Sequence, residues 1–384
     1  MEKWKIVEMK DICTGIFEGP HATPKESQTG GVYLGIPAIS DDGHINFEKA
    51  KRISEDDLCI WTKRVTPQED DIVFTNEATL NLYAIIPAGF HGCLGRRLGL
   101  IRPNKDLVNV RYLFYYFFSP DWRETISRNK VSGATVERIL MTKFPHFPVK
   151  LPPLSVQNRI ASILSSIDEK ITLNNLINHN LEAQADSLIA TAIANNTVRE
   201  VHLRDICSYV TEKIDCKTLN VTNYVSTDNM QTNRGGVGIA SSIPDGNCIS
   251  FRERDILVSN IRPYFKKIWR ASFSGGCSND VLCFRSINGY FSVLYHLLRT
   301  DSFFEYVMSG AKGSKMPRGD KQHIMNWNVP FFDNDILISL EGALETIDRR
   351  VSFFQNENAL LCEIRDALLP NLMARCLFDN HLNF

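Results

Sequence analysis

An apolar repeat with heptad spacing runs through two stretches of the chain and constrains its fold more than any other feature. From Ile160 to Ala192, apolar or small residues recur at alternating steps of four and three, and only Asn174 and Asn178 interrupt the series. This spacing keeps one stripe of an α-helix facing a partner helix. At about 1.5 Å per residue, about forty residues make a rod on the order of 60 Å long. The sequence therefore predicts a long spacer helix over residues 151–196.

The same pattern recurs near the end of the chain. Shifted by 180 positions, Ile-Asp-Glu-Lys-Ile at residues 167–171 falls on Ile-Asp-Arg-Arg-Val at residues 347–351, and Asn178 falls on Asn358. A polar residue in an otherwise apolar seam fixes the register of packed helices. We therefore expect a second long helix over residues 333–378 that pairs with the first, although each helix could instead pack only on its own domain. The residues predicted to pair the helices or to bind another subunit are Ile160, Leu164, Ile167, Ile171, Asn178, Leu181, Leu188, Leu340, Leu344, Ile347, Val351, Phe354, Asn358, Leu361 and Leu368.

Segments outside the helices are also duplicated. Met-Lys-Asp-Ile-Cys at residues 9–13 is echoed by Leu-Arg-Asp-Ile-Cys at residues 203–207, and Glu-Asp-Asp-Ile-Val at residues 69–73 by Glu-Arg-Asp-Ile-Leu at residues 253–257. The offset between the copies drifts, as insertions in loops produce. The predicted order is a first domain over residues 1–150, the first helix, a second domain over residues 197–332, the second helix, and a tail over residues 379–384.

Each domain is expected to be of the α+β class. Short β-rich runs such as residues 71–75 and 98–101 are bounded by Gly, Pro, Asn and Asp, as strands are. An aromatic helix is predicted over residues 110–118, and a short helix near residues 136–141.

Composition places limits on function. The 384 residues include 43 basic and 44 acidic side chains, so net charge neither indicates nor excludes nucleic acid, and any basic surface must be local. Ten cysteines without CxxC pairs or zinc-ligand spacing are typical of buried thiols in a cytosolic protein. There is no signal peptide and no apolar run of about 20 residues, so we expect a cytoplasmic location without membrane contact.

A loop of small residues at 130–135 is a candidate phosphate contact, and its counterpart in the second domain covers residues 312–321. Small residues let the backbone approach a phosphate, N–H groups at a helix start favour anions, and Lys or Arg supplies charge. A solvated surface loop is the alternative. The candidate DNA-binding residues are Lys130, Ser132, Gly133, Thr135 and Arg138 in the first domain and Lys312, Ser314, Lys315, Arg318 and Lys321 in the second.

Basic clusters and polar strand ends add further candidates. Arginine can bond bidentately to guanine and asparagine to adenine, and aromatic side chains among basic residues suit a nucleic-acid surface. The arginines could equally pair with internal carboxylates, and the asparagines could serve only as turn residues. These candidates are Asn76, Thr79, Asn81, Arg96 and Arg97 in the first domain and Asn260, Arg262, Tyr264, Lys266 and Lys267 in the second.

The sequence carries no recognisable catalytic motif. Asn-Val-Pro-Phe at residues 328–331 lacks the first proline of the adenine-methyltransferase motif, and no glycine-rich cofactor loop precedes it. A phosphate-binding GxxxxGK[ST] loop is absent as well. We therefore expect no catalytic residue, no cofactor and no metal in this chain.

Residues 151–171, LPPLSVQNRIASILSSIDEKI, resemble the specificity subunits of type I restriction–modification systems. In the first domain, the segments at residues 19–24, 61–67 and 93–100 are similar to one recurring class of target-recognition domain in that family. The resemblance covers essentially the whole chain. The second long helix departs from the family pattern, because Phe-Phe-Asp-Asn at residues 331–334 replaces Leu-Pro-Pro-Leu.

The resemblance implies an α+β protein in which two target-recognition domains are separated by two long antiparallel coiled-coil helices, in the order domain, helix, domain, helix. It implies binding to double-stranded DNA at a bipartite asymmetric site, with His21 as a further contact or, alternatively, part of a rigid turn. The implied partners are methyltransferase subunits, two per chain, which bring S-adenosylmethionine and modify adenine, and restriction subunits, which bring ATP and Mg²⁺. Exposed heptad positions are the implied docking surface for methyltransferase helices.

Two other classes of function stay open from the residues alone. The chain could be a stand-alone DNA-modifying enzyme, a nuclease or a methyltransferase, which an activity assay on the purified chain would reveal. It could also be a coiled-coil scaffold that binds only protein, which a salt-dependent DNA-binding measurement would distinguish.

Overall fold

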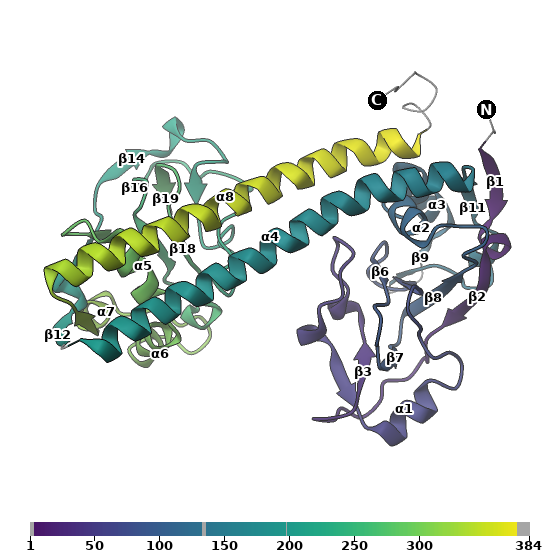
Figure 1. Ribbon diagram of the computed structural model, residues 1–384, viewed down its shortest axis with the longest axis horizontal. Coiled ribbons are helices and arrows are strands. Elements are labelled where there is room, and N and C mark those ends of the chain that lie inside the picture. The colour runs from purple at the N-terminus through teal and green to yellow at the C-terminus, as the bar shows by residue number, and fades with distance from the viewer. Residues whose placement is uncertain (1–3, 133–135, 197, 375–384) are drawn as a thin grey trace. The chain divides into compact units, whose positions relative to one another are not determined.

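The computed structural model describes residues 4–132, 136–196 and 198–374 (Figure 1). The chain divides into two compact units, residues 1–172 with 359–384 and residues 173–358. Each unit contains one α+β domain and a segment of two long helices, α4 (Leu154–Asn195) and α8 (Asn334–Met373). The predicted α+β class and the two long helices are confirmed.

The domain of the first unit is built on a four-stranded antiparallel sheet in the order β2–β8–β5–β6. A three-stranded sheet, β4–β3–β7, shares a core with it through Leu34, Val73 and Leu94, and its strands β3 and β7 run parallel. Every residue of β5 is buried, because both of its faces are covered. The strands are β2 (Cys13–Glu18), β3 (Gly31–Leu34), β4 (Lys51–Ile53), β5 (Ile72–Thr75), β6 (Tyr83–Ile85), β7 (Gly92–Leu94) and β8 (Leu98–Pro103).

The domain of the second unit repeats the antiparallel sheet, but its second sheet has four strands and a different strand order. Its antiparallel sheet has the order β13–β20–β17–β18, and its second sheet, β14–β16–β19–β15, again contains one parallel pair, β15 with β19. Thr75 lies opposite Leu98 in the first unit, and Ser259 lies opposite Val281 in the second. The strands are β13 (Cys207–Tyr209), β14 (Lys213–Asp215), β15 (Tyr224–Val225), β16 (Asn247–Phe251), β17 (Ile256–Ser259), β18 (Ile268–Arg270), β19 (Gly275–Cys277) and β20 (Val281–Ser286).

A two-stranded antiparallel ribbon joins the beginning and the end of each domain. In the first unit β1 (Lys5–Glu8) pairs with β11 (Pro148–Leu151). In the second unit β12 (Arg199–His202) pairs with β21 (Asn328–Phe331). Because β11 and two prolines precede it, α4 begins at Leu154 and not at residue 151.

Two helices follow the strands of the antiparallel sheet in each domain. Asn109 caps α2 (Val110–Tyr116), the predicted aromatic helix, by accepting a hydrogen bond from the N–H of Tyr112 at 3.0 Å. The next helix, α3 (Pro120–Asn129), is absent from the sequence analysis. The indole N–H of Trp122 in α3 donates to the Tyr83 hydroxyl at 2.8 Å, which ties α3 to β6. The counterparts in the second unit are α5 (Phe291–Leu298) and α6 (Asp301–Ser309).

The prediction of a short helix near residues 136–141 is wrong. β9 (Val131–Ser132) and β10 (Glu137–Arg138) form an antiparallel ribbon instead. Arg138 also forms an antiparallel bridge with Glu77, and the N–H of Ile139 donates to the Asn76 carbonyl at 2.8 Å. These strand-type bonds use the backbone groups that a helix would need. Two further short helices are α1 (Glu55–Trp61) and α7 (Lys321–Met325).

The long helices pack antiparallel in both units. In the first unit, Leu164 near the start of α4 shares a core with Leu372 near the end of α8. In the second unit, Leu181 of α4 shares a core with Leu344 near the start of α8. Of the predicted seam residues, Ile160, Leu164, Leu181, Leu340, Leu344 and Ile347 are buried, and Ile167, Ile171, Val351, Phe354, Leu361 and Leu368 are half-buried.

The seam position predicted for Leu188 belongs to Ile189 instead. Leu188 is 38% exposed, whereas Ile189 is 7% exposed and lies in the core of the second unit. A straight α-helix drifts by about 20° per heptad against a strict seven-residue repeat. Leu188 lies four heptads beyond Ile160, so the accumulated drift of roughly 80° moves the buried position to the next residue.

A polar layer interrupts the apolar seam within the second unit. The buried Asn174 donates through Nδ2 to Glu357 Oε2 at 2.7 Å and to Asn358 Oδ1 at 2.8 Å. Asn358 donates in turn to Asn175 Oδ1 at 2.8 Å. The partners of Asn358 are therefore Asn174 and Asn175, while Asn178 is buried with an Oδ1 that has no partner among the described residues.

None of the described helices combines the length and the apolar character needed to span a lipid bilayer. Among the described residues, no group of three or more His, Cys, Asp or Glu side chains is arranged to hold a metal ion.

Candidate nucleic-acid interface

In the first unit, three segments that carry predicted DNA contacts converge at the end of β5. The N–H of Asn76 donates to the carbonyl of Arg97 at 3.0 Å. The carbonyl of Asn76 accepts from Ile139 at 2.8 Å, and Glu77 bridges to Arg138. The arginine-bearing turn at residues 96–97 and the arginine-bearing strand β10 therefore share one backbone frame.

The cations of this frame differ in how they are paired. Arg97 has a φ of 72°, and its Nε lies 3.5 Å from Glu77 Oε1. Lys130 Nζ lies 2.6 Å from Glu137 Oε1. Arg96 and Arg138 are exposed, and among the described residues no carboxylate pairs with the Arg96 guanidinium. Arg96 is thus the most available cation of this turn.

The remaining candidates of the first domain fall into three groups. His21 is largely exposed, 3.7 Å from Glu18 Oε2, and Thr79 is exposed. Asn81 has a φ of 67° and accepts from the Tyr83 hydroxyl at 3.2 Å, as a turn residue does. Ser132 contributes its backbone to β9. Gly133 and Thr135 lie outside the described residues.

The second unit repeats the backbone frame with other side chains. The N–H of Asn260 donates to the carbonyl of Asp280 at 2.8 Å. The carbonyl of Asn260 accepts from Gly319 at 3.3 Å, and Ile261 bridges to Arg318. Asn260, Asp280 and Arg318 thus stand where Asn76, Arg97 and Arg138 stand in the first unit.

A strained turn extends this frame. Arg262 and Lys266 flank residues 263–265, and both have a φ of 50°. The left-handed conformation costs a non-glycine residue roughly 1–2 kcal/mol, and the hydrogen bond from the Arg262 N–H to the Pro317 carbonyl at 2.8 Å holds it in place. The turn exposes 47% of Tyr264. Strain of this kind is frequent at binding sites.

Three of the candidate cations of the second domain are held by carboxylates. Lys266 lies 2.8 Å from Asp301, Lys312 lies 2.7 Å from Asp320, and Arg318 lies 3.1 Å from Asp280. Hydrogen bonds from Lys266 and Arg234 lower the pKa of Asp301 to about 2, and those from Lys312 and from backbone N–H groups lower the pKa of Asp320 to about 2. A DNA phosphate must compete with these carboxylates. Among the described residues, the exposed Lys315 has no such competitor.

The predicted helix start is wrong in the first domain, whereas in the second domain a helix, α7, does follow the loop and is capped by a carboxylate. No helix follows the loop of the first domain within the described residues, since β10 takes its place. In the second domain, Asp320 Oδ1 accepts from the N–H groups of Gln322 at 2.9 Å and His323 at 3.1 Å. The carboxylate therefore occupies the site that an anion would need at α7. Ser314 and Lys321 are exposed.

Three of the predicted contacts point into the protein. Lys267 donates to the Thr227 carbonyl at 2.6 Å. Asn76 is only 4% exposed and Asn260 only 8% exposed. Their amides are too buried to pair with the edge of a base, so a direct bidentate contact with adenine is excluded in this conformation.

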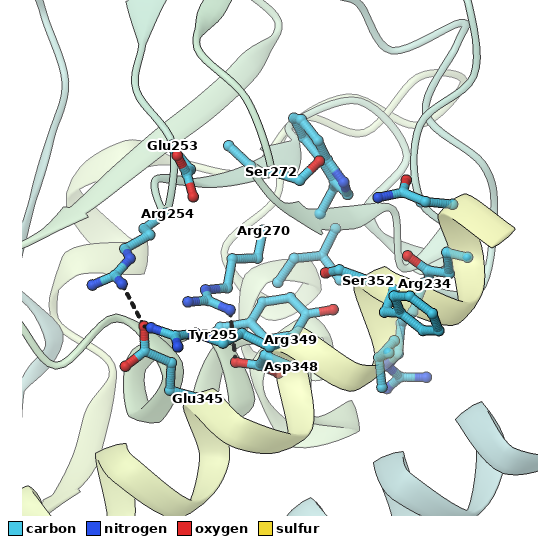
Figure 2. Close-up of a pocket in the computed structure, with 18 of the residues that line it drawn as sticks. Arg234, Glu253, Arg254, Arg270, Ser272, Tyr295, Glu345, Asp348, Arg349 and Ser352 are labelled. Carbon is cyan, nitrogen blue, oxygen red and sulfur yellow. Dashed lines mark hydrogen bonds and ion pairs between the residues drawn. The ribbon is translucent and has the colours of Figure 1, made fainter.

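The cavity in Figure 2 lies between the second domain and α8, both within the second unit. It has a volume of about 360 Å³, and its walls include Arg254, Arg270, Glu345 and Asp348. Arg270 lies 3.0 Å from Asp348, and Arg254 pairs with Glu345. These two ion pairs cross the cavity and hold the second domain on α8.

Asp348 and Asp168 occupy equivalent positions on the two long helices, and neither is among the predicted site residues. Asp348 Oδ1 lies 2.9 Å from Nε2 of the buried His296 in α5. Asp168 Oδ2 accepts from the Tyr115 hydroxyl of α2 at 2.6 Å. In each unit, an aspartate of the repeated Ile-Asp motif ties the aromatic helix to a long helix. The alignment of residues 167–171 with 347–351 contains the signal that could have identified them.

One known protein family resembles the first half of this chain. Residues 1–183 match the family model described as type I restriction modification DNA specificity domain. Residues 1–183 are therefore similar to a type I restriction–modification DNA specificity domain. The matched segment includes the backbone frame of the first domain and α4 as far as residue 183.

Two relatives extend the comparison. A protein named "Putative type I restriction enzyme MjaX specificity subunit" from Methanocaldococcus jannaschii is 29% identical over 187 residues, 46% of this chain and 42% of that protein. The match therefore spans less than half of the relative's length. The S subunit of a type I restriction–modification system from M. genitalium superposes with a TM-score of 0.59 and 14% identity, covering 96% of both chains. The fold is shared along nearly the whole chain.

Proposed function

We propose that this chain is the DNA-binding specificity subunit of a type I restriction–modification complex. It reads a bipartite, asymmetric site in double-stranded DNA, one half-site with each domain, and it directs adenine methylation or restriction by partner subunits. The chain itself is non-catalytic. S-adenosylmethionine, ATP and Mg²⁺ are bound by the partners, and the complex acts in the cytoplasm.

The observation that carries this proposal is the recurrence of one backbone frame with different side chains. Both frames join an asparagine, a turn and an arginine-bearing segment. Arg97 of the first frame is replaced by Asp280, and Glu77 is replaced by Ile261. Identical scaffolds with different exposed groups suit two readers of different base sequences, because base edges are distinguished by their donors and acceptors.

The outer faces of the long helices support the proposed methyltransferase contacts. In the second unit, Leu173, Leu176 and Phe353 are more than half exposed. A groove of about 320 Å³ is lined by Leu181, Phe353 and other residues of the two helices, with Arg349 and Arg350 beside them. An amphipathic helix with acidic flanks would cover this surface. Methyltransferase helices are the proposed occupants, two subunits per chain, and restriction subunits join through them.

A binding experiment with the full chain and its methyltransferase tests the proposal. The complex should select one bipartite sequence from a library of randomised DNA duplexes and should methylate adenines only there. Selection of no sequence, or methylation by the purified chain alone, would refute the specificity role or the non-catalytic role, respectively.

A further inference from the structure

Asn76 and Asn260 occupy equivalent positions, each directly after the central strand of its antiparallel sheet. β5 ends at Thr75 and β17 ends at Ser259. Both asparagines are more than nine-tenths buried, and in both the side-chain Oδ1 is buried with no hydrogen-bond partner among the described residues. The same unusual arrangement in two domains of different sequence calls for a common explanation.

Backbone conformation does not explain it. Asparagine is often retained at strand ends because it tolerates positive φ. Positive φ occurs at Ala78, Asn81 and Arg262 near these positions, but neither Asn76 nor Asn260 has it. A buried amide oxygen without a partner lowers stability, so a side chain without polar atoms would serve a purely structural turn better.

The backbone groups of the two asparagines connect the turn of each frame to the segment that carries its arginine, Arg138 or Arg318. Asn76 bonds the turn of Arg96 and Arg97 on one side and the segment after Arg138 on the other, at 3.0 and 2.8 Å. Asn260 bonds the turn at Asp280 and Gly319, the neighbour of Arg318, at 2.8 and 3.3 Å. Each asparagine thus sets the separation between a turn and a strand that face the proposed DNA surface.

The side chains extend the connection. Asn76 Nδ2 donates to Glu18 Oε1 at 3.2 Å, and Glu18 Oε2 lies 3.7 Å from the imidazole of His21. In the second unit, a Cβ atom built on Gly319 would lie 2.8 Å from Asn260 Oδ1. The amide of Asn260 therefore packs closely against the Gly319 backbone, and only glycine fits there without displacement.

We infer that Asn76 and Asn260 are positioning residues for sequence reading, each for the half-site of its own domain. This inference rests on the proposed function, and it assigns the two residues a role other than contact with a base. Through its side chain, by the Glu18 contact of Asn76 or by the packing of Asn260 against Gly319, each asparagine holds the turn and the arginine-bearing segment of its frame in register. The exposed side chains of these segments then meet base edges at fixed places. Because hydrogen-bond discrimination between bases depends on such placement, loosening one frame relaxes the reading of one half-site.

The test uses the full chain with its methyltransferase and a library of DNA duplexes with randomised bases. Asn76→Ala should lower discrimination against wrong bases in the first half-site on the order of ten-fold and leave the second half-site unchanged. Asn260→Ala should do the reverse. Thus each variant is the matched control for the other. The salt dependence of binding should stay the same in both, because no phosphate contact is removed.

Glu18 provides a second arm, since it is partly exposed and its replacement leaves the core intact. Glu18→Ala removes the acceptor for Asn76 Nδ2 and should relax the first half-site, whereas Glu18→Gln keeps an acceptor oxygen and should preserve it. If Asn76→Ala does not fold, the comparison of Glu18→Ala with Glu18→Gln tests the positioning role of Asn76 in the first domain.

The outcomes separate the inference from the proposed function. Equal loss at both half-sites, uniform weakening on all sequences, or undiminished discrimination in Asn76→Ala and Glu18→Ala would overturn the positioning role. Failure of the unsubstituted complex to select any bipartite sequence would instead refute the proposed function.

Discussion

Replacement of Asp71 by Asn should destabilise the first domain far more than the same change at the adjacent Asp70. Asp71 is 2% exposed and receives two hydrogen bonds from Arg102, from Nε to Oδ1 and from Nη2 to Oδ2, both at 2.8 Å. It also accepts from the N–H of Gln68 at 2.8 Å. The carboxylate raises the pKa of the Arg102 guanidinium through these bonds. The pair cross-links β5 to β8 at the end opposite Asn76.

The magnitude follows from what the new side chain in Asp71→Asn would present. Its amide NH₂ would face the N–H groups of Arg102, so one hydrogen bond would be replaced by a repulsive contact between donors, and the guanidinium would lose its counter-charge. Breaking a buried ion pair costs about 3–5 kcal/mol. Arg102 is 27% exposed, and water compensates part of the loss, so we expect roughly 2–3 kcal/mol. Asp70→Asn should cost about 0–1 kcal/mol, because its partner Lys105 is exposed and Asp70 is only half-buried, and Asn tolerates the φ of 70° at this position.

Amide hydrogen exchange measures the loss of stability separately for each unit. A single unfolding free energy would not, because a chain of two units does not unfold in one cooperative transition. Amides of β5 and β8 should exchange about 30- to 150-fold faster in Asp71→Asn, at ten-fold for each 1.4 kcal/mol. Protection in β17 and β20 should be unaltered. Asp255→Asn should reverse the pattern, since Arg285 binds Asp255 in the same bidentate way at 2.8 and 2.6 Å. Equal protection of β5 and β8 in Asp70→Asn and Asp71→Asn would show that the pair contributes nothing.

Four further predictions concern function. The purified chain should show no methyltransferase, nuclease or ATPase turnover, and activity in a preparation shown to be free of partners would contradict this. Lys315→Ala should weaken binding to all DNA sequences alike and lower the salt slope of binding by about one. Arg318→Ala should lower the slope less, because Asp280 already competes for that side chain. An unchanged slope in Lys315→Ala would show that Lys315 does not contact a DNA phosphate. Half-site centres should lie about one helical turn of DNA apart, roughly 10 base pairs. Insertion of about one turn of helix, four residues, near Asn178 should lengthen the unread gap between the half-sites and leave both half-sequences intact. Methylation mapping would measure both the gap and the half-sequences. Residues 1–198, supplied with the methyltransferase, should dimerise through α4 and recognise a palindrome of the first half-site, and a monomeric fragment in sedimentation would exclude such pairing.

The structure adds a reason to expect dimerisation of that fragment. In the full chain, Asn174 of α4 faces Asn358 of α8. Shifted by 180 positions, Asn358 corresponds to Asn178 and Asn174 corresponds to Phe354. In a pair of identical α4 helices, Asn174 of each copy would therefore face Asn178 of the other. The Asn178 oxygen that has no partner among the described residues of the full chain would then acquire one.

The long helices and the duplication could be predicted because their signals extend over many residues. A period sustained over eight turns averages out local exceptions, and Leu188 fails only because drift accumulates along that length. By contrast, α3 has a clear local start signal, with Ser119 as cap and Pro120 in the first turn. This signal is short, and the ten residues of α3 carry no period sustained over many turns, so the predicted elements do not include α3.

The pairing of the cations could not be predicted, because it depends on residues far apart in the sequence. Lys266 meets Asp301, and Arg318 meets Asp280. The burial of Asn76 likewise depends on segments some 20 to 60 residues away, at Arg97 and Ile139. Local sequence identifies the type of side chain at a strand end, but it does not tell whether neighbouring segments cover that side chain.

The two-stranded ribbon at the base of each domain makes that domain an exchangeable cassette. β1 and β11 lie side by side with Lys5 opposite Leu151, so the whole intervening segment can be excised and replaced through two short joints a few ångströms apart. A foreign domain would have to continue the same ladder, pack against the long helices and supply a polar side chain for Asp168, as Tyr115 does here and His296 does for Asp348. Under the proposed function, recombination between short matching sequences at these joints would change the DNA specificity and leave the proposed partner-binding helices as they are.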